Sequence, residues 1–402
     1  MNGHYVRALA VAACAAIFAA CSGGATNSTL PTGTTGGTAG AMALGNGTMN
    51  AQQVCSAVNL RPGYARCFAW IRTDVIPNRM HPDAGSYGPS DLQTAYNLPS
   101  STNGTGQIVG IVDAFGYPNA ESDLGAYRSH YGLSACTTAN GCFKKVNQTG
   151  GTTYPPTNSG WDGEQALDVD MVSAICPNCH IVLVEATDNS FNNLGIAEKQ
   201  AFTQGAGQVS NSYGGGEFKA TNANYKHAHT VIVASSGDSG YGAQQPCSYS
   251  TVVCVGGTTL SKASPRTEAG WIGAGSGCSA LVVKPAYQND VGCTTRSESD
   301  VSAVANPAFP VAVFLNGGFT AFGGTSVASP IIGAVYALAG NHSNHTNAKS
   351  IWQTGINASK LNDVTTGGLN GTCPPAYPYI CKPGTGYDGV TGWGSPNGVG
   401  AF

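Results

Sequence analysis

The chain has 402 residues and a formal net charge of −3, and only 10% of its residues are charged, against about a quarter in average proteins. This length accommodates one large domain or two ordinary ones, and the near-neutral charge argues against a nucleic-acid partner. The sparse charge also suits acidic media, because few carboxylates must change protonation state as the pH falls.

The first 21 residues are typical of an export signal. Arg7 supplies a positive charge, and an apolar run from Ala8 to Ala20 follows, which is shorter than the ~20 residues of a membrane span. The sequence Phe18-Ala-Ala-Cys21 resembles a bacterial lipobox, with Phe18 in place of the usual Leu. Lipidation of Cys21 and simple cleavage after a small residue both stay open. We expect an exported protein, extracellular or at the cell surface, and no later segment is apolar enough to span a bilayer.

The cysteines support export. Two of the 14 lie in the signal region, and an even number of the others in an exported chain suggests disulfides. Cys176-Pro-Asn-Cys179 also has the spacing of a zinc or redox motif, but no second such pair accompanies it, so a structural loop is favoured. Sequence alone does not fix connectivity, and our hypothesis pairs neighbours: Cys55/Cys67, Cys136/Cys142, Cys176/Cys179, Cys247/Cys254, Cys278/Cys293 and Cys373/Cys381.

Composition divides the rest of the chain into three parts. Residues 22–50 are mostly Gly, Thr, Ser, Ala and Asn, which predicts a flexible tether. Residues 51–95 are expected to form a short N-terminal extension or prosegment. Residues 96–402 alternate strand-like and helix-like stretches, as in an α/β domain.

The elements of this domain follow in chain order. Short apolar runs predict strands at residues 106–113, 180–185, 208–212, 230–234 and 253–255. Helical patterns cover residues 120–131, 164–174, 194–205 and 326–339. The strand at 230–234 delivers Asp238 just beyond its carboxyl end, where sites form in open parallel sheets.

Glu164 and Asp168 are four residues apart on a predicted helix, which places both carboxylates on one face. Ser326 begins the last predicted helix, whose N-terminal N–H groups would stabilise an oxyanion, and Pro330 is expected in its first turn. A serine needs a base before it attacks a carbonyl. No histidine lies in a motif that would supply one, so a carboxylate base is the alternative. Each motif also has a plainer interpretation: a solvated helix face, a turn around Asp238, or a helix cap at Ser326.

Taken in order, Glu164-x-x-x-Asp168, Ser-Gly-Asp238-Ser-Gly and Gly-Thr-Ser326-x-Ala-Ser-Pro resemble the motifs of the sedolisins, or serine-carboxyl peptidases. The resemblance extends from Tyr96 to the C-terminus. It implies a subtilisin-like, three-layer α/β fold with a mainly parallel central sheet, endopeptidase activity at acidic pH, and one bound calcium ion.

The resemblance also implies roles. Ser326 would be the nucleophile, Glu164 the base that later protonates the leaving amine, and Asp168 the residue that orients Glu164. Asp238, kept protonated, would donate a hydrogen bond to the oxyanion together with the Ser326 N–H. A carboxyl can donate only when neutral, and clustered carboxyls cannot all ionise, so activity should fade toward neutral pH.

Two further segments match the family. Ser212-Tyr213-Gly214 resembles the strand that pairs with the substrate backbone, with Tyr213 where the family often has Trp; a Gly-rich loop is the alternative. A calcium ion needs six to eight oxygen ligands, and five residues near the C-terminus would supply five of them. These residues are the Asp363 and Asp388 side chains and the carbonyls of Val364, Gly384 and Gly386. The alternative is an Asp/Gly-rich turn without an ion.

The chain departs from the family in the length of its N-terminal segment, and from subtilisins in its lack of the catalytic histidine motif. Family members carry a long folded prodomain, whereas only residues 22–95 lie between the signal and the domain, so the prosegment is short or absent. Asp113 ends a strand where a subtilisin carries its catalytic Asp, but the histidine motif is missing, so we interpret Asp113 as a structural or cleft residue. Asp170 is likewise expected to be structural.

We therefore predict an exported, calcium-stabilised, acid-acting endopeptidase that is monomeric and cleaves proteins or peptides, with a membrane tether if Cys21 is lipidated. One alternative is a catalytically silent surface protein that keeps the fold as a binding module. Another is a subtilisin-type enzyme active at neutral pH.

Overall fold

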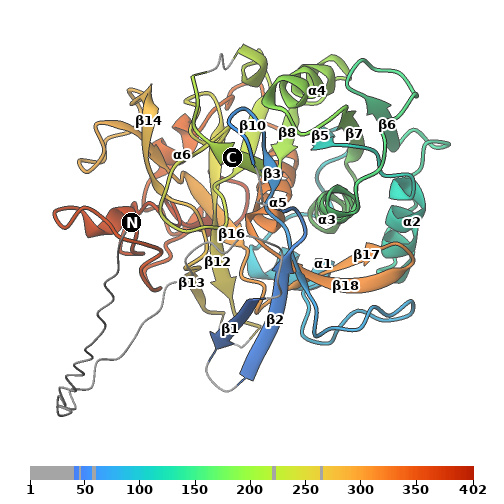
Figure 1. Cartoon of the computed structure of the whole chain (residues 1–402), viewed down its shortest axis with the longest axis horizontal. Coiled ribbons are helices and arrows are strands. Elements are labelled where there is room, and N and C mark those ends of the chain that lie inside the picture. Colours follow the sequence, from blue (N-terminus) through green and yellow to red (C-terminus); the bar gives the residue numbers. More distant parts are fainter. Residues whose placement is uncertain (1–39, 45–46, 57–59, 220–222, 263–265) are drawn as a thin grey trace, which may run out of the picture. The chain divides into compact units, whose positions relative to one another are not determined.

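The computed structural model describes residues 40–44, 47–56, 60–219, 223–262 and 266–402 (Figure 1). The predicted export signal, Cys21 and residues 22–39 of the predicted tether lie outside the described residues. Strands β1 (Gly40–Leu44) and β2 (Gly47–Gln53) pair with each other, so the structure differs from the predicted flexible tether over these residues. In the described part of the chain, no helix is both long and apolar enough to cross a membrane.

The central sheet has the strand order β13-β12-β10-β8-β5-β7-β6, and β16 also pairs with β12. Its pairings are parallel except that of β12 with β13. This arrangement confirms the predicted α/β fold with a mainly parallel central sheet. The strands are β5 (Ile108–Ala114), β6 (Phe143–Asn147), β7 (His180–Ala186), β8 (Gln208–Asn211), β10 (Val231–Ser235), β12 (Val253–Leu260), β13 (Glu268–Gly270) and β16 (Val301–Val304).

Alternating side chains of the central strands fill two cores. In β5, Val109 and Ile111 enter one apolar cluster, and Val112 enters the other. In β7, Leu183 enters the first cluster and Val184 the second. Both faces of these strands are apolar, as a sheet covered on both sides requires.

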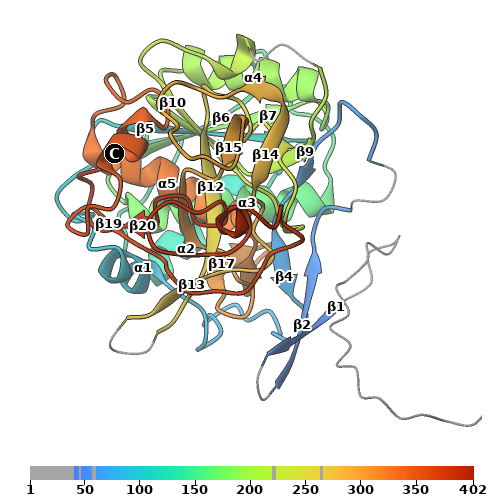
Figure 2. The ribbon, with the colours of Figure 1, turned by 90° about the vertical axis from the view of Figure 1, so that its left-hand side faces the viewer.

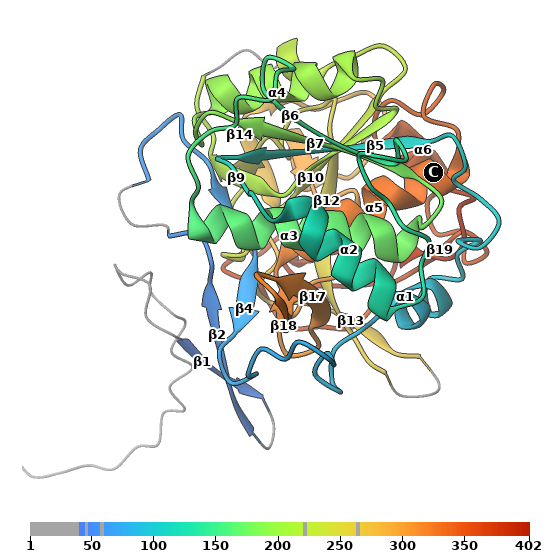
Figure 3. The same cartoon turned by 90° about the vertical axis from the view of Figure 1, so that its right-hand side faces the viewer.

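Helices supply those two covers (Figure 3). Helix α4 (Phe191–Thr203) packs on one face of the sheet against β5 and β7. On the other face α3 (Ser159–Ile175) packs against α5 (Thr325–Ala339) and α2 (Ala120–His130). The shorter helices are α1 (Pro89–Ala95), α6 (Lys349–Thr354) and the 3-10 turns η1 (Ala223–Tyr225) and η2 (Pro378–Ile380).

Smaller sheets join the N-terminal extension to the rest. An antiparallel sheet has the order β1-β2-β4-β18-β17, and a second has the order β11-β9-β3; Figure 2 shows β2 beside β4. Two further pairs are β14 with β15 and β19 with β20. The bounds are β3 (Arg66–Cys67), β4 (Trp70–Arg72), β9 (Tyr213–Gly216), β11 (Gln244–Gln245), β14 (Gly277–Val283), β15 (Thr295–Glu298), β17 (Val311–Leu315), β18 (Gly318–Gly323), β19 (Leu361–Asn362) and β20 (Ser395–Pro396).

The predicted strands and helices of the domain are present, and the main differences are at helix starts. Helix α3 begins at Ser159, before the predicted start at Glu164, because the Asn158 side chain accepts hydrogen bonds from the N–H groups of Gly160 and Trp161. Pro330 lies inside α5, so its predicted place in the first turn was wrong.

The predicted cysteine pairing is confirmed. Each of the six neighbouring couples forms a disulfide in the structure. Cys176 and Cys179 are bonded to each other, so in this state they offer no thiolate pair to a zinc ion.

Candidate active site

The four predicted catalytic residues come from three separate elements and are buried together. Glu164 and Asp168 lie on α3 and Ser326 in the first turn of α5, and all three are 0% exposed. Asp238, which follows β10, is 6% exposed. Burial removes the plainer interpretation of the Glu164/Asp168 pair as a solvated helix face, because isolated carboxyls are rarely buried without a purpose.

A tight turn between β18 and α5 presents Ser326. Gly324 has a φ of +97°, a conformation that side chains disfavour, and a Cβ on it would lie 1.9 Å from the Phe68 carbonyl oxygen. The Ser326 hydroxyl donates to the Ser212 carbonyl at 3.0 Å and accepts from the Phe68 N–H at 3.1 Å.

Pro330 has a local consequence for this helix. Its missing N–H would have bonded to the Ser326 carbonyl four residues earlier. That carbonyl lies 3.4 Å from the Ser212 hydroxyl oxygen, whose shorter hydrogen bond, at 2.7 Å, is to Asp168 Oδ1. The helix therefore stays linked to the strand end that bears Ser212.

Glu164 lies next to Ser326 and a second carboxyl. Burial raises the pKa of Glu164 well above its usual value, and the neighbouring Asp168 raises it further. Hydrogen bonding from the Ser326 hydroxyl and from the Ala69 N–H, which donates to Glu164 Oε2 at 3.1 Å, opposes this shift by favouring the charged form. The Ser212 carbonyl and Glu164 thus both lie within reach of the Ser326 hydroxyl, whose single proton can bond to only one of them at a time.

Asp168 and Asp113 extend the carboxyl cluster. Burial raises the pKa of Asp168, whereas the Ser212 hydroxyl, which donates to Asp168 Oδ1 at 2.7 Å, lowers it. Asp113, at the carboxyl end of β5, is 0% exposed, and burial raises its pKa, followed by the charges of Asp168 and Glu164. Asp113 thus lies in one buried carboxyl cluster with Glu164 and Asp168, which agrees with its interpretation as a structural or cleft residue at the end of a central strand.

Asp238 lies on the other side of the nucleophile. The Thr325 N–H and hydroxyl donate to Asp238 Oδ1 at 2.8 and 2.7 Å, and Asp238 Oδ2 lies beside Gly324, 2.8 Å from where a Cβ would stand. Burial raises the pKa of Asp238 to about 7, although Thr325 and the Arg66 charge act in the opposite direction. In acid Asp238 is therefore neutral and able to donate.

Ser212, Tyr213 and Gly214 form the strand edge next to Ser326. Their backbone pairs antiparallel with the extension, Tyr213 with Cys67 and Gly214 with Arg66. The Tyr213 side chain is buried, and its hydroxyl donates to Asn211 at 2.6 Å. This edge has the polarity and position that a peptide strand needs for β-pairing.

The predicted calcium residues meet in one C-terminal loop. Asp363 Oδ2 accepts from the Gly386 N–H at 3.0 Å, and Asp388 Oδ2 from the Gly384 N–H at 3.2 Å. Asp363 Oδ1 is buried without a hydrogen-bond partner in the described part of the chain. The free buried oxygen of Asp363 beside a glycine-rich loop suits a hard cation. Both oxygens of Asp388 accept hydrogen bonds, Oδ1 from the Val390 and Thr391 N–H groups and Oδ2 also from the Thr391 hydroxyl.

The sequence profile of the subtilase family matches residues 92–377. The chain belongs to the subtilase family. Within it, the relatives are sedolisins. Kumamolisin from Bacillus sp. (strain MN-32) is 28% identical over 357 residues, and sedolisin from Pseudomonas sp. (strain 101) is 28% identical over 362 residues; both alignments cover 78% of this chain. The chain spans about three fifths of these relatives, 62% and 60% of their lengths.

Solved structures agree on the fold of this subtilase. A Pseudomonas sedolisin, a serine-carboxyl proteinase complexed with two molecules of pseudo-iodotyrostatin, superposes with a TM-score of 0.66 at 25% identity, covering 80% of this chain and 96% of the other. Sphericase gives a TM-score of 0.50 at 16% identity, over 76% and 96% of the two chains, which supports the subtilisin-like fold alone. The sedolisin resemblance expected from the three motifs is confirmed.

Proposed function

We propose that this subtilase is an exported endopeptidase that cleaves proteins or peptides in acid through an acyl-enzyme on Ser326. The observation that carries the proposal is the setting of that serine, between buried Glu164 and buried Asp238. In the described part of the chain, no hydrogen bond to Ser326 comes from a histidine. A carboxyl is therefore the group positioned to take its proton.

The catalytic cycle follows from the geometry. Glu164 takes the proton as Ser326 Oγ attacks the substrate carbonyl, and it returns the proton to the leaving amine. Water then attacks the ester, with Glu164 again as the base. Asp168 supports Glu164 electrostatically, and Ser212 joins Asp168 to the strand that receives the substrate.

The developing oxyanion needs donors that are already in place. The Ser326 N–H, in the first turn of α5, is one. Protonated Asp238 Oδ2 is the other donor. It lies beside Gly324, as does the Phe68 carbonyl oxygen. Because the pKa of Asp238 is about 7, this donor is lost as the pH rises above neutrality.

We further propose a structural calcium ion held by the Asp363 and Asp388 carboxylates and the carbonyls of Val364, Gly384 and Gly386. When bound, the ion would neutralise two carboxylates and hold the C-terminal loop. Burial raises the pKa of Asp388 to about 8, and a cation beside it would offset this cost of ionisation.

Export is part of the proposal. The disulfides of the described chain suit an oxidising compartment, and the predicted signal would direct the chain there. An extracellular protein and one tethered through a lipid on Cys21 are both compatible with the fold. Labelling with a radioactive fatty acid, with Cys21→Ser as the control, separates the two.

Digestion of denatured casein by the purified protein at about pH 4 tests the function. We expect cleavage by the wild type and none by Ser326→Ala. If the wild type is still inactive after its N-terminal extension has been removed from the cleft, the result favours the catalytically silent binding module.

A further inference from the structure

Thr325 connects the helix that carries the nucleophile to the loop that carries Asp238. It directly precedes Ser326 in α5 and is 0% exposed. Its N–H and its hydroxyl both donate to Asp238 Oδ1, at 2.8 and 2.7 Å. Its carbonyl accepts from the hydroxyl of Ser235, at the end of β10, at 2.9 Å. One residue therefore fastens the start of α5 to the end of β10 and to the loop that follows it.

The Thr325 hydroxyl has a single proton, and its neighbours decide where that proton points. The Gly237 N–H donates to Thr325 Oγ1 at 3.2 Å, which occupies one lone pair of this oxygen. In the described ranges of the chain, the hydroxyl itself has one acceptor, Asp238 Oδ1. A buried donor without an acceptor is unfavourable, so the hydroxyl proton points to Asp238.

The hydrogen bonds from Thr325 restrict where Asp238 can hold its own proton. A carboxyl oxygen accepts about two hydrogen bonds, and Oδ1 already accepts two. A proton on Oδ1 would be directed against the hydroxyl proton of Thr325. Oδ2, by contrast, is buried and makes no hydrogen bond to any residue that the structure describes. The proton of neutral Asp238 therefore fits on Oδ2.

Oδ2 is also the oxygen that faces the nucleophile's side of the loop. It lies beside Gly324, 2.8 Å from where a Cβ of that residue would stand. Gly324 leads directly into Thr325 and Ser326, and its lack of a side chain leaves room beside Oδ2. A proton on Oδ2 is thus directed to the oxyanion, whereas a proton on Oδ1 is directed back into the protein.

We propose that Thr325 is a positioning residue that, by donating twice to Asp238 Oδ1, keeps the acid proton of Asp238 on Oδ2, where it can be donated to the oxyanion. The inference rests on the proposed function, in which Asp238 supplies that hydrogen bond. Thr325 acts only through Asp238 and does not touch the reacting atoms. Without its hydroxyl, the carboxyl would hold its proton on either oxygen, and only one of these forms would stabilise the transition state.

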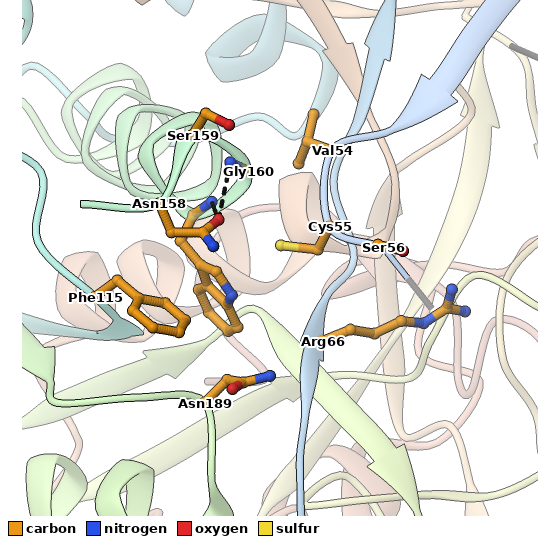
Figure 4. Close-up of a pocket in the computed structure, with 10 residues that line it drawn as sticks. Val54, Cys55, Ser56, Arg66, Phe115, Asn158, Ser159, Gly160 and Asn189 are labelled. Carbon is orange, nitrogen blue, oxygen red and sulfur yellow. Dashed lines mark hydrogen bonds between the residues drawn. The ribbon is translucent and has the colours of Figure 1, made fainter. Parts of the chain in front are cut away.

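Asp238 also faces a cation from the N-terminal extension. Arg66 on β3 lowers the pKa of Asp238 through its charge, and its guanidinium donates to the hydroxyl of the adjacent Ser239 at 2.7 Å. Arg66 lines a pocket of about 310 Å³ between β3 and the start of α3, and its guanidinium points away from Asn158 on the other side of that pocket (Figure 4). The cation therefore acts on the loop of Asp238 and is separate from Thr325.

Two further groups influence the same carboxyl. The Trp70 indole on β4 lowers the pKa of Asp238. Glu164 on α3 lies near enough for the charge of Asp238 to raise its own pKa. These groups and Arg66 are the same in the wild type and in Thr325 variants, so a difference between those proteins reports on Thr325.

The sign of one pKa change distinguishes the two positions of the proton. If the Thr325 hydroxyl donates to Oδ1, it stabilises the ionised carboxyl, so its removal raises the pKa of Asp238 above its value of about 7. If Oδ1 instead held the proton and donated it to Thr325, the bond would stabilise the neutral form. Removal of the hydroxyl would then lower the pKa.

Thr325→Val and Thr325→Ser form a matched pair for this test. Valine is close in shape and loses the hydroxyl, whereas serine keeps it. The full chain is labelled with ¹³C at its aspartate carboxyls and carries Ser326→Ala, which prevents proteolysis during the titration. NMR then follows Asp238, assigned with Asp238→Asn. We expect the midpoint to rise in Thr325→Val and to stay in place in Thr325→Ser. A midpoint that falls or stays in Thr325→Val, or that rises equally in both variants, overturns the inference.

Hydrolysis of a synthetic peptide by the two variants, with Ser326 intact, adds a catalytic measurement. Thr325→Val should lower kcat about 10- to 100-fold, less than the loss of the donor itself, and leave KM nearly unchanged, because an oxyanion donor acts in the transition state. Its decline in rate should begin at a higher pH than that of the wild type. Thr325→Ser should recover most of kcat. Thermal melting reports whether both variants fold. Equal losses in both, with the pH profile of the wild type, would show a merely structural residue and overturn the inference.

The two measurements separate this inference from the proposed function. A wild type that cleaves the peptide while Asp238 titrates identically with and without the hydroxyl overturns the inference and keeps the peptidase. If the wild type cleaves nothing, the proposed function fails, and the titration still decides where the proton lies. A raised midpoint in Thr325→Val then supports Oδ2, and a lowered or unchanged midpoint overturns it.

Discussion

The backbone N–H of Ala69 donates to Glu164 Oε2 at 3.1 Å. An acid that protonates a leaving amine must lie within hydrogen-bond reach of its nitrogen, and Glu164 meets that condition with a peptide of its own chain. The same carboxyl is under the influence of the Ser326 hydroxyl. One residue is thus placed to serve as base in the first half of the reaction and as acid in the second.

The role of Asp238 predicts unequal effects for two substitutions. Asp238→Ala removes an oxyanion donor and should lower turnover about 100- to 1,000-fold. Asp238→Asn keeps a donor that does not ionise, so it should retain more activity and lose the decline that the wild type shows as the pH passes about 7. Rates of peptide cleavage between about pH 3 and pH 8 check both. Equal losses in the two variants, with unchanged pH profiles, would contradict the donor role.

Buried carboxyls should make the protein more stable in mild acid than at neutral pH. Glu198 on α4 is 0% exposed, and burial raises its pKa to about 8 despite the opposing Asn211 side chain. The pKa of Glu198 in the unfolded chain is about 4.3. At pH values between about 4.3 and about 8, the folded state therefore holds a proton on Glu198 that the unfolded state has lost. The free energy of unfolding therefore falls as the pH rises through this window.

Glu198→Gln should remove that part of the pH dependence. We expect little change in stability at about pH 4 and a gain on the order of 3 kcal/mol at about pH 8. Urea unfolding at the two pH values measures the difference. A variant that is less stable than the wild type at the higher pH would refute this assignment.

The sequence predicted the catalytic residues because their local patterns are distinctive, but it did not predict their surroundings. A Glu/Asp pair four residues apart has the same pattern on a solvated helix, and only the tertiary structure shows that every residue of 160–175 except Asp162 is buried. The place of Asp113 in the carboxyl cluster depends on the position of β5 in the interior of the central sheet, between β8 and β7, which only the structure shows. Phe68 and Ala69 meet partners that are 258 and 95 positions away, a separation that no local periodicity encodes.

Calcium should raise the melting temperature. At a concentration about 100 times the Kd, binding adds about 2.7 kcal/mol to the free energy of unfolding. A chelator should remove this gain, and calcium but not magnesium should restore it, because a flexible loop of carbonyl and carboxylate oxygens suits the larger ion. Asp363→Asn should abolish the response in calorimetry. Identical melting of the wild type with and without chelator would rule the ion out.

Arg296, on β15, and Asp300, directly before β16, form a buried ion pair, and both side chains are 0% exposed. Asp300 Oδ1 accepts from the guanidinium at 2.9 Å and from the Trp352 indole at 2.7 Å. Arg296→Ala leaves a carboxylate buried without its counter-charge and should cost about 3–5 kcal/mol. Replacing both residues, as in Arg296→Met with Asp300→Asn, should cost less, because no charge is left unpaired and the amide oxygen still accepts a hydrogen bond. Denaturant unfolding compares the two, and a double variant less stable than the single one would contradict this explanation.

The most direct test of the carboxyl mechanism is the hydrolysis of a synthetic peptide containing one Phe-Ala bond, followed at about pH 4 for the wild type and Glu164→Gln. The amide keeps the size of the side chain but neither takes nor returns a proton, so we predict a loss of at least ~1,000-fold in the rate. Hydrolysis by Glu164→Gln at the wild-type rate would show that another group arms Ser326.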